Sequence, residues 1–142
     1  MNTTTTKSSR PLQDVNIIGT TPLISPQELK QEFPDSTAVK DHVGQSRAIV
    51  EDILRGSDTR VIAIVGPCSI HNTDMAMEYA RKLKSVADEV SDKIFIVMRV
   101  YFEKPRTTVG WKGLINDPHM NDTFDIALGL RKARQILLDI NG

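Results

Sequence analysis

The chain has 142 residues, with 18 basic and 18 acidic side chains, one cysteine and 39% hydrophobic residues, a composition typical of a globular domain. Its formal net charge of zero argues against a general nucleic-acid or membrane-surface binder, because no overall field attracts a polyanion. The longest apolar runs have five residues, whereas a transmembrane helix needs about 20. With no internal disulfide available and no apolar signal core, we expect a reducing, cytoplasmic compartment.

The first part of the chain predicts a tail followed by two helices. Residues 1–24 are polar or irregular, and we expect a flexible tail and arm. Residues 25–58 predict a helical extension, which begins with Ser25 as N-cap and Pro26 at the first helical position. The first helix should end near Phe33, and a second helix should span about 37–55, with Gly56 as its terminator.

The pattern then changes to that of a βαβ unit. Val61–Val65 is a β-branched, continuously apolar run, which predicts a strand buried on both faces of a parallel sheet. A helix capped by Asn72 or Thr73 follows, and Ile94–Val100 predicts a second buried strand. Because the crossover between such strands is right-handed in about 98% of cases, we expect the two strands to be parallel.

A third long helix is predicted to start at Asp122 or Thr123 and to end at Gly142. Two strands cannot complete a parallel α/β fold, so residues 59–142 resemble part of something larger. A (β/α)8 TIM barrel needs roughly 250 residues. We therefore expect an α/β fold made of an N-terminal arm and the first βα units of such a barrel, incomplete in this chain.

In parallel α/β folds the working residues follow the carboxyl ends of strands. After the first predicted strand, the only thiol, Cys68, and a histidine, His71, lie in a segment that begins with Gly66 and Pro67. Cys68 is either a small core residue or a ligand. His71 is either a polar residue near the helix start or a catalytic group.

The segment after the second predicted strand is strongly basic. Residues 99–112 hold four cations and one acid, and Arg99 is predicted to lie within the apolar strand, where an unpaired guanidinium is costly. Arg and Lys are natural partners of phosphate oxygens, and Thr107 and Thr108 add hydroxyl donors. The segment therefore predicts an anion site, and a solvated basic loop is the alternative.

Aromatic side chains between these cations raise another functional alternative. Tyr101, Phe102 and Trp111 could stack on the bases of single-stranded nucleic acid. This reading is weaker, because a binder of that type normally extends its basic surface beyond one loop. No glycine spacing in these segments fits a P-loop or a dinucleotide fingerprint.

At these residues the sequence resembles the 3-deoxy-D-arabino-heptulosonate 7-phosphate (DAHP) synthases of the aromatic-amino-acid-regulated class. Two runs carry the resemblance: Gly66-Pro67-Cys68-Ser69-Ile70-His71, and Met98 to Pro118 with Arg99-Val100-Tyr101-Phe102-Glu103-Lys104-Pro105-Arg106-Thr107-Thr108 at its core. The resemblance implies a (β/α)8 barrel enzyme of the shikimate pathway. That transferase condenses phosphoenolpyruvate with erythrose 4-phosphate and releases phosphate.

The resemblance also implies roles for single residues. Cys68 matches a ligand of a divalent metal ion of the Mn, Fe, Co or Zn type, and Arg99 and Lys104 match catalytic residues that bind phosphoenolpyruvate. Lys104, Pro105, Arg106 and Thr107 match the motif that receives erythrose 4-phosphate. The remaining metal ligands of the family, a His, a Glu and an Asp, belong to later strands that this chain does not contain.

Further partners follow from the same resemblance: an aromatic amino acid as feedback effector and a homo-oligomer when full length, with neither nucleic acid nor membrane. Because one protein ligand does not make a metal site, we expect the isolated 142 residues neither to fold stably nor to catalyse. The alternative is a noncatalytic phosphate-binding or regulatory fragment that associates with another chain.

Overall fold

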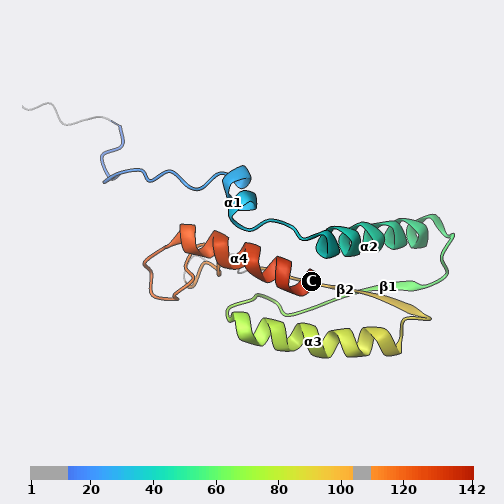
Figure 1. Ribbon diagram of the computed structural model, residues 1–142. Helices are drawn as coiled ribbons and strands as arrows, with labels where there is room; N and C mark the ends of the chain where they lie inside the picture. The colour runs from blue at the N-terminus through green and yellow to red at the C-terminus, as the bar shows by residue number, and fades with distance from the viewer. Residues whose placement is uncertain (1–12, 104–109) are drawn as a thin grey trace, which may run out of the picture.

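The structure, a computed structural model, describes residues 13–103 and 110–142, and its elements follow the order ααβαβα (Figure 1). The elements are α1 (Pro26–Glu32), α2 (Thr37–Arg55), β1 (Val61–Val65), α3 (Thr73–Glu89), β2 (Ile94–Met98) and α4 (Ile126–Asn141). The chain is an α/β fold. Residues 1–12 of the predicted tail and arm lie outside the described residues.

Local capping chemistry sets the start of α1, the end of α2 and the start of α3 where the sequence predicted them. The Ser25 hydroxyl accepts from the Glu28 backbone N–H at 3.2 Å, and the Glu28 carboxylate accepts from the Ser25 backbone N–H at 2.9 Å, which completes a capping box. These hydrogen bonds lower the pKa of Glu28. Asn72 caps α3, and Gly56 ends α2 with a φ of 80°, a left-handed conformation that glycine adopts without strain.

The two strands pair in parallel, as predicted, with Val61 opposite Ile94 and Val65 opposite Met98. Helix α3 connects them, so β1, α3 and β2 form a βαβ unit (Figure 1). Successive side chains of a strand point to opposite faces. Ile94, Ile96 and Met98 share one face and line a cavity with residues of α2, α3 and α4, so the helices cover this side of the sheet.

The expectation that both faces of the first strand are buried is wrong for the described residues. Val61 is 66% exposed and Ile64 is 69% exposed. Ile64 alternates with Ala63 and so points to the face opposite the helices. No helix of the described chain packs against that face, and its apolar side chains therefore remain accessible.

The second strand is shorter than predicted, because β2 ends at Met98 and not at Val100. Arg99 therefore lies just beyond the strand and is exposed. Its backbone N–H still donates to the Val65 carbonyl at 2.7 Å. The next position of the ladder would need an N–H from Pro67, which proline lacks, so the pairing stops here.

The last helix begins later than predicted, at Ile126 with Asp125 as its N-cap. The predicted starts fail because of the backbone before it. Met120, Asp122 and Phe124 have φ values of 57°, 59° and 51°, in the left-handed region that a right-handed helix excludes. A helix can begin only after this irregular stretch.

Helix α4 packs against both α2 and α3 and also holds residues 32–35 of the helical extension. Arg131 Nε donates to a Glu32 carboxylate oxygen at 2.6 Å, and Arg134 Nη2 donates to the Phe33 carbonyl and to Asp35 at 3.0 and 2.7 Å. The neighbouring Glu32 raises the pKa of Arg131. Residues 32–35 of the helical extension are thus fastened to α4 by two arginines on successive turns.

The buried core lies close to the carboxyl ends of the strands. Its members are Ile70, Ala76, Leu114 and Ile136, with Val100, Phe102, Trp111 and Ile140 packed around them. Leu114 is 1% exposed. The segments that follow β1 and β2 are therefore anchored by apolar burial, the main favourable term in folding.

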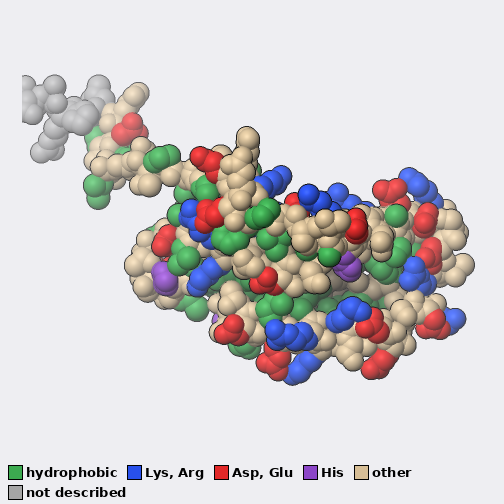
Figure 2. All heavy atoms as spheres, viewed as in Figure 1, with side chains coloured by type: hydrophobic (Ala, Val, Ile, Leu, Met, Phe, Trp, Pro, Cys, Tyr) green, Lys and Arg blue, Asp and Glu red, His purple; other side chains and the backbone are tan. Residues whose placement is uncertain are grey.

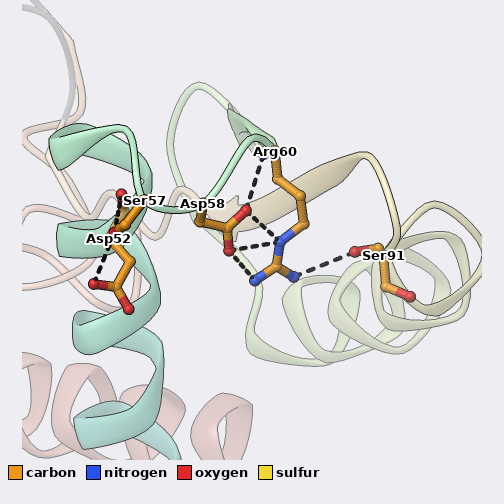
Figure 3. A network of polar contacts seen from close by, with 5 residues as sticks. All are labelled: Asp52, Ser57, Asp58, Arg60 and Ser91. Atoms are coloured by element: carbon orange, nitrogen blue, oxygen red, sulfur yellow. Dashed lines mark hydrogen bonds and ion pairs between the residues drawn. The ribbon is translucent and has the colours of Figure 1, made fainter.

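A polar network closes the opposite end of the sheet (Figure 3). Arg60, the residue before β1, forms two hydrogen bonds from Nε and one from Nη2 to the Asp58 carboxylate, at 3.2, 3.0 and 2.7 Å. Its Nη1 donates to the Ser91 carbonyl at 3.2 Å, and its guanidinium lies 5.5 Å from the centre of the Phe95 ring. These contacts lower the pKa of Asp58 and raise that of Arg60, so both groups stay charged.

Charges of both signs are mixed over the visible face of the helices, without a large patch of one sign (Figure 2). Within residues 13–103 and 110–142, no helix is long and apolar enough to cross a membrane.

Candidate functional site

The segments that follow β1 and β2 lie side by side at the carboxyl end of the sheet. The Ile70 backbone N–H donates to the Tyr101 carbonyl at 2.8 Å. Arg99 Nη1 donates to the Pro67 carbonyl at 3.3 Å. The topology therefore brings together the two segments that the sequence singled out, as parallel strands require.

Arg99 is held by neutral groups. Its guanidinium carbon lies 4.7 Å from the centre of the Tyr101 ring, within the range of a cation–π interaction. Among the residues that the structure describes, no carboxylate forms a salt bridge with Arg99. A guanidinium carries five N–H donors, and within the described residues one of them donates to a protein group, the Pro67 carbonyl.

Gly66 lets the two segments approach each other. A Cβ atom at this position would meet the Arg99 carbonyl oxygen at 2.3 Å and the Arg99 Cβ atom at 2.9 Å, closer than real contacts allow. A glycine is therefore required where the chain leaves β1. The sequence alone does not indicate this contact with Arg99.

Cys68 is exposed at the same end of the sheet. Its thiol is accessible in the described part of the chain, and a thiolate is a good ligand for divalent transition metals. In the described parts of the chain, however, no three His, Cys, Asp or Glu side chains gather to hold an ion. A single thiol does not make a metal site.

A short bridge joins two residues of the segment that follows β2. Glu103 and Gly113 form an antiparallel bridge, and the Leu114 N–H donates to the Phe102 carbonyl at 2.9 Å. Gly113 has a φ of 109°, a conformation that favours glycine. Lys104, Pro105, Arg106, Thr107 and Thr108, which the sequence predicts as substrate-binding residues or hydroxyl donors, lie outside the described residues.

A buried carboxylate organises the segment after this bridge. Asp117 is 2% exposed, and its oxygens accept from the backbone N–H groups of Asn121 and Asp122 at 3.4 and 3.1 Å. The Asp117 carbonyl accepts from the Trp111 indole N–H at 2.6 Å. These bonds hold the left-handed stretch before α4, and they fix Trp111 as part of the core and not as an exposed stacking platform.

His71 lies at the start of α3 and lines a cavity of about 120 Å³ with Ser69, Asn72 and Tyr79. It is exposed, and no structural contact assigns it to catalysis. Both readings of His71 stay open at this point.

Sequence reasoning missed two residues of this region, Tyr101 as the partner of Arg99 and Asp117 as a buried carboxylate. The first had a usable signal, because residues two apart in an extended segment point to the same side. Asp117 had no such signal, because its hydrogen-bond donors are backbone N–H groups of an irregular segment without a periodic sequence pattern.

The fold and this basic carboxyl-end region agree with a comparison to known families. The model of the DAHP synthetase I family matches residues 28–140, and the chain therefore belongs to this family. DAHP synthases are enzymes of the transferase class.

Individual relatives give the same result. The chain is 54% identical over 129 residues to the Tyr-sensitive phospho-2-dehydro-3-deoxyheptonate aldolase of Salmonella typhimurium, covering 91% of this chain and 36% of the relative. It is 52% identical over 119 residues to the Phe-sensitive protein of Escherichia coli, covering 84% and 34%.

A solved structure is also similar. The phospho-2-dehydro-3-deoxyheptonate aldolase of Francisella tularensis matches with a TM-score of 0.84 and 46% identity, covering 89% of this chain and 37% of that one. The chain thus spans about a third of the length of these relatives.

Proposed function

We propose that this chain supplies the first part of a DAHP synthase, which condenses phosphoenolpyruvate with erythrose 4-phosphate. In this reaction C3 of phosphoenolpyruvate forms a bond to the aldehyde carbon of the sugar, water is consumed and inorganic phosphate leaves. The observation that carries the proposal is the exposed Arg99, which the fold holds through neutral groups at the carboxyl end of β2.

Arg99 would bind the phosphate or carboxylate of phosphoenolpyruvate through the N–H groups that face solvent, and Lys104 would add a second cation to the same substrate. Lys104, Pro105, Arg106 and Thr107 would receive the sugar phosphate. Charge-assisted hydrogen bonds of this kind are the strong ones, and they stabilise charge where bonds change.

The Cys68 thiolate would provide one ligand to a divalent metal ion. When bound, such an ion acts as a Lewis acid on the aldehyde oxygen or orients a water molecule. Further ligands would come from other strands of a (β/α)8 barrel, in which residues 59–142 form the first units, residues 25–58 the helical extension and residues 1–24 the tail and arm. An aromatic amino acid would act as effector of the assembled enzyme, which would be a homo-oligomer.

The experiment that tests this function joins the chain to the rest of a relative. In the joined protein, residues 28–140, which the family model matches, replace the corresponding segment of the Salmonella typhimurium relative. We expect phosphate release that requires both substrates and is abolished by a metal chelator. The isolated chain should release none, and an inactive but folded joined protein would contradict the proposal.

Two variants of the joined protein test the assigned residues. Cys68→Ser should abolish activity together with metal binding, and metal binding of unchanged strength would show that the thiol is misassigned. Arg106→Ala should raise the KM for erythrose 4-phosphate far more than the KM for phosphoenolpyruvate, and equal increases would contradict the division of the segment.

The noncatalytic alternative predicts a different result. A regulatory fragment would bind the intact relative and change its activity without entering the reaction. Adding the isolated chain to the Salmonella typhimurium relative tests this, and an unchanged rate speaks against it.

A further inference from the structure

The Tyr101 ring and the Arg99 guanidinium form a stacked pair at the edge of the candidate site, with 4.7 Å between the guanidinium carbon and the ring centre. We propose that Tyr101 is a positioning residue, whose ring holds Arg99 in the orientation that receives the anionic groups of phosphoenolpyruvate. This inference rests on the proposed function, and it assigns to Tyr101 a role that acts through Arg99.

Three contacts restrict Arg99 from the side of the protein. The ring covers one face of the guanidinium, the Pro67 carbonyl takes one N–H at 3.3 Å, and the Arg99 backbone is packed against Gly66. A free arginine side chain loses up to about 2 kcal/mol of rotamer entropy when it is fixed. Because these contacts already restrict the side chain, an incoming anion has less of this cost to offset.

Tyr101 is itself well anchored. Its carbonyl accepts from the Ile70 N–H at 2.8 Å, and Ile70 is 2% exposed within the core. The following residue, Phe102, packs against the same core. The ring therefore stands on a fixed piece of backbone, which also joins the Arg99 segment to the segment that carries Cys68.

The aromatic face, and not the hydroxyl group, provides the interaction with a cation. Phenylalanine keeps that face, whereas leucine keeps apolar bulk without it. Tyr101→Phe and Tyr101→Leu therefore separate the positioning role from simple packing. The chain also offers a matched control, since Arg60 and Phe95 form the second such pair at the opposite end of the sheet.

The kinetic experiment uses the joined protein defined above. We expect Tyr101→Leu to raise the KM for phosphoenolpyruvate about 3-fold to 30-fold, the factor that corresponds to the loss of a cation–π contact. The KM for erythrose 4-phosphate should change by less than about 2-fold in the same variant. Tyr101→Phe should restore the original value, and the control Phe95→Leu should leave the KM for phosphoenolpyruvate unchanged.

A second readout does not depend on activity. In the joined protein labelled with ¹⁵N, the Arg99 Nε–H resonance should shift upfield because of the Tyr101 ring current. The shift should persist in Tyr101→Phe and vanish in Tyr101→Leu. Titration with phosphoenolpyruvate should move this resonance at lower concentration in the unsubstituted joined protein than in the Leu variant.

The outcomes separate the two proposals. An inactive joined protein whose Arg99 resonance still responds in the predicted order refutes the catalytic function and supports the positioning role. An active joined protein in which Tyr101→Leu leaves the KM for phosphoenolpyruvate unchanged, or raises both KM values equally, overturns the positioning role. A Phe variant as impaired as the Leu variant also overturns it, and so does the absence of the ring-current shift.

Discussion

Arg60 and Arg99 lie at opposite ends of the same two-stranded sheet, and their side chains have different partners. Arg60 precedes β1, and the Asp58 carboxylate neutralises it through three hydrogen bonds (Figure 3). Arg99 follows β2, where an aromatic ring and a carbonyl hold it, and the described residues supply no carboxylate. The first arginine has a carboxylate partner, whereas the described residues hold the second only through neutral groups.

This difference separates a structural cation from the one that we propose to bind substrate. Both arginines stack on an aromatic ring and both donate to a backbone carbonyl. The carboxylate partner is what distinguishes them. An ion pair within the chain removes the electrostatic reason to bind an anion, because the desolvated charge is already compensated.

The largest expected effect comes from removing each arginine in turn from the joined protein. Arg99→Met should lower kcat/KM for phosphoenolpyruvate by about 10²-fold to 10³-fold. This is the loss expected when the guanidinium is removed from a charge pair that the bound substrate buries. Arg60→Met should lower the Tm without changing kcat/KM per folded molecule. Steady-state kinetics and thermal unfolding check this, and similar kinetic losses for both variants would break the distinction.

A smaller effect is expected from adding one methyl group beside Arg99. Gly66→Ala places a Cβ atom against the Arg99 backbone and should lower the free energy of unfolding by about 1–3 kcal/mol, the usual cost of overpacking. Gly44→Ala is the matched control, because this position within α2 has nothing within 4 Å. It should stabilise the helix by about 0.5–1 kcal/mol.

Denaturant unfolding of the joined protein measures both changes. The Gly66 variant should also lose affinity for phosphoenolpyruvate, because its new methyl group displaces Arg99. A Gly66→Ala protein as stable and as active as the original would show that the two segments are less closely packed than the structure indicates.

The smallest expected effect is a pH dependence at the other end of the sheet. Hydrogen bonds from Arg60 lower the pKa of Asp58 in the folded state, so this carboxylate stabilises the fold above its unfolded pKa of about 3.9. The contribution is lost as the pH falls through the lower, folded value. The difference in free energy of unfolding between the original protein and Asp58→Asn should therefore shrink on acidification below about pH 4.

Denaturant unfolding at a series of pH values between neutrality and pH 3 measures this difference. A constant difference would contradict the assignment of Asp58 as the partner of Arg60. The affinity of Asp58→Asn for phosphoenolpyruvate should remain unchanged, which separates this end of the sheet from the other.

Much of the fold followed from local chemistry that the sequence states directly. The capping box at Ser25, the left-handed Gly56 and the Asn72 cap fix helix ends through groups three or four residues apart, and such short-range signals are readable without a structure. The parallel pairing of β1 and β2 followed from the handedness of βαβ units.

The end of β2 and the start of α4 differ from the predicted positions because of a distant residue in one case and irregular backbone in the other. The second strand ends early because Pro67, about thirty residues earlier, has no N–H to donate to it. The start of α4 is delayed by three residues with positive φ, which a non-glycine sequence rarely signals. The exposure of Ile64 depends on which layers cover the sheet in this chain, and the apolar run alone does not specify those layers.

The sequence predicted the positive charge of the candidate site but not the residues that contact Arg99. The excess of basic residues after β2 identified Arg99, and the strand order placed Cys68 nearby. The roles of Gly66 and Tyr101 required the distance between two segments that are about thirty residues apart in the chain. Positions that hold a functional side chain often look ordinary in the sequence, because their contribution is geometric.

The bridge between Glu103 and Gly113 fixes the two ends of the segment between them at one point beyond β2. The conformational entropy lost when such a segment is closed depends only weakly on its length. Insertions or deletions at residues 104–109, which leave Trp111 packed against the core, should therefore leave the helices and the sheet intact. The length of this segment can thus be varied without rebuilding the scaffold.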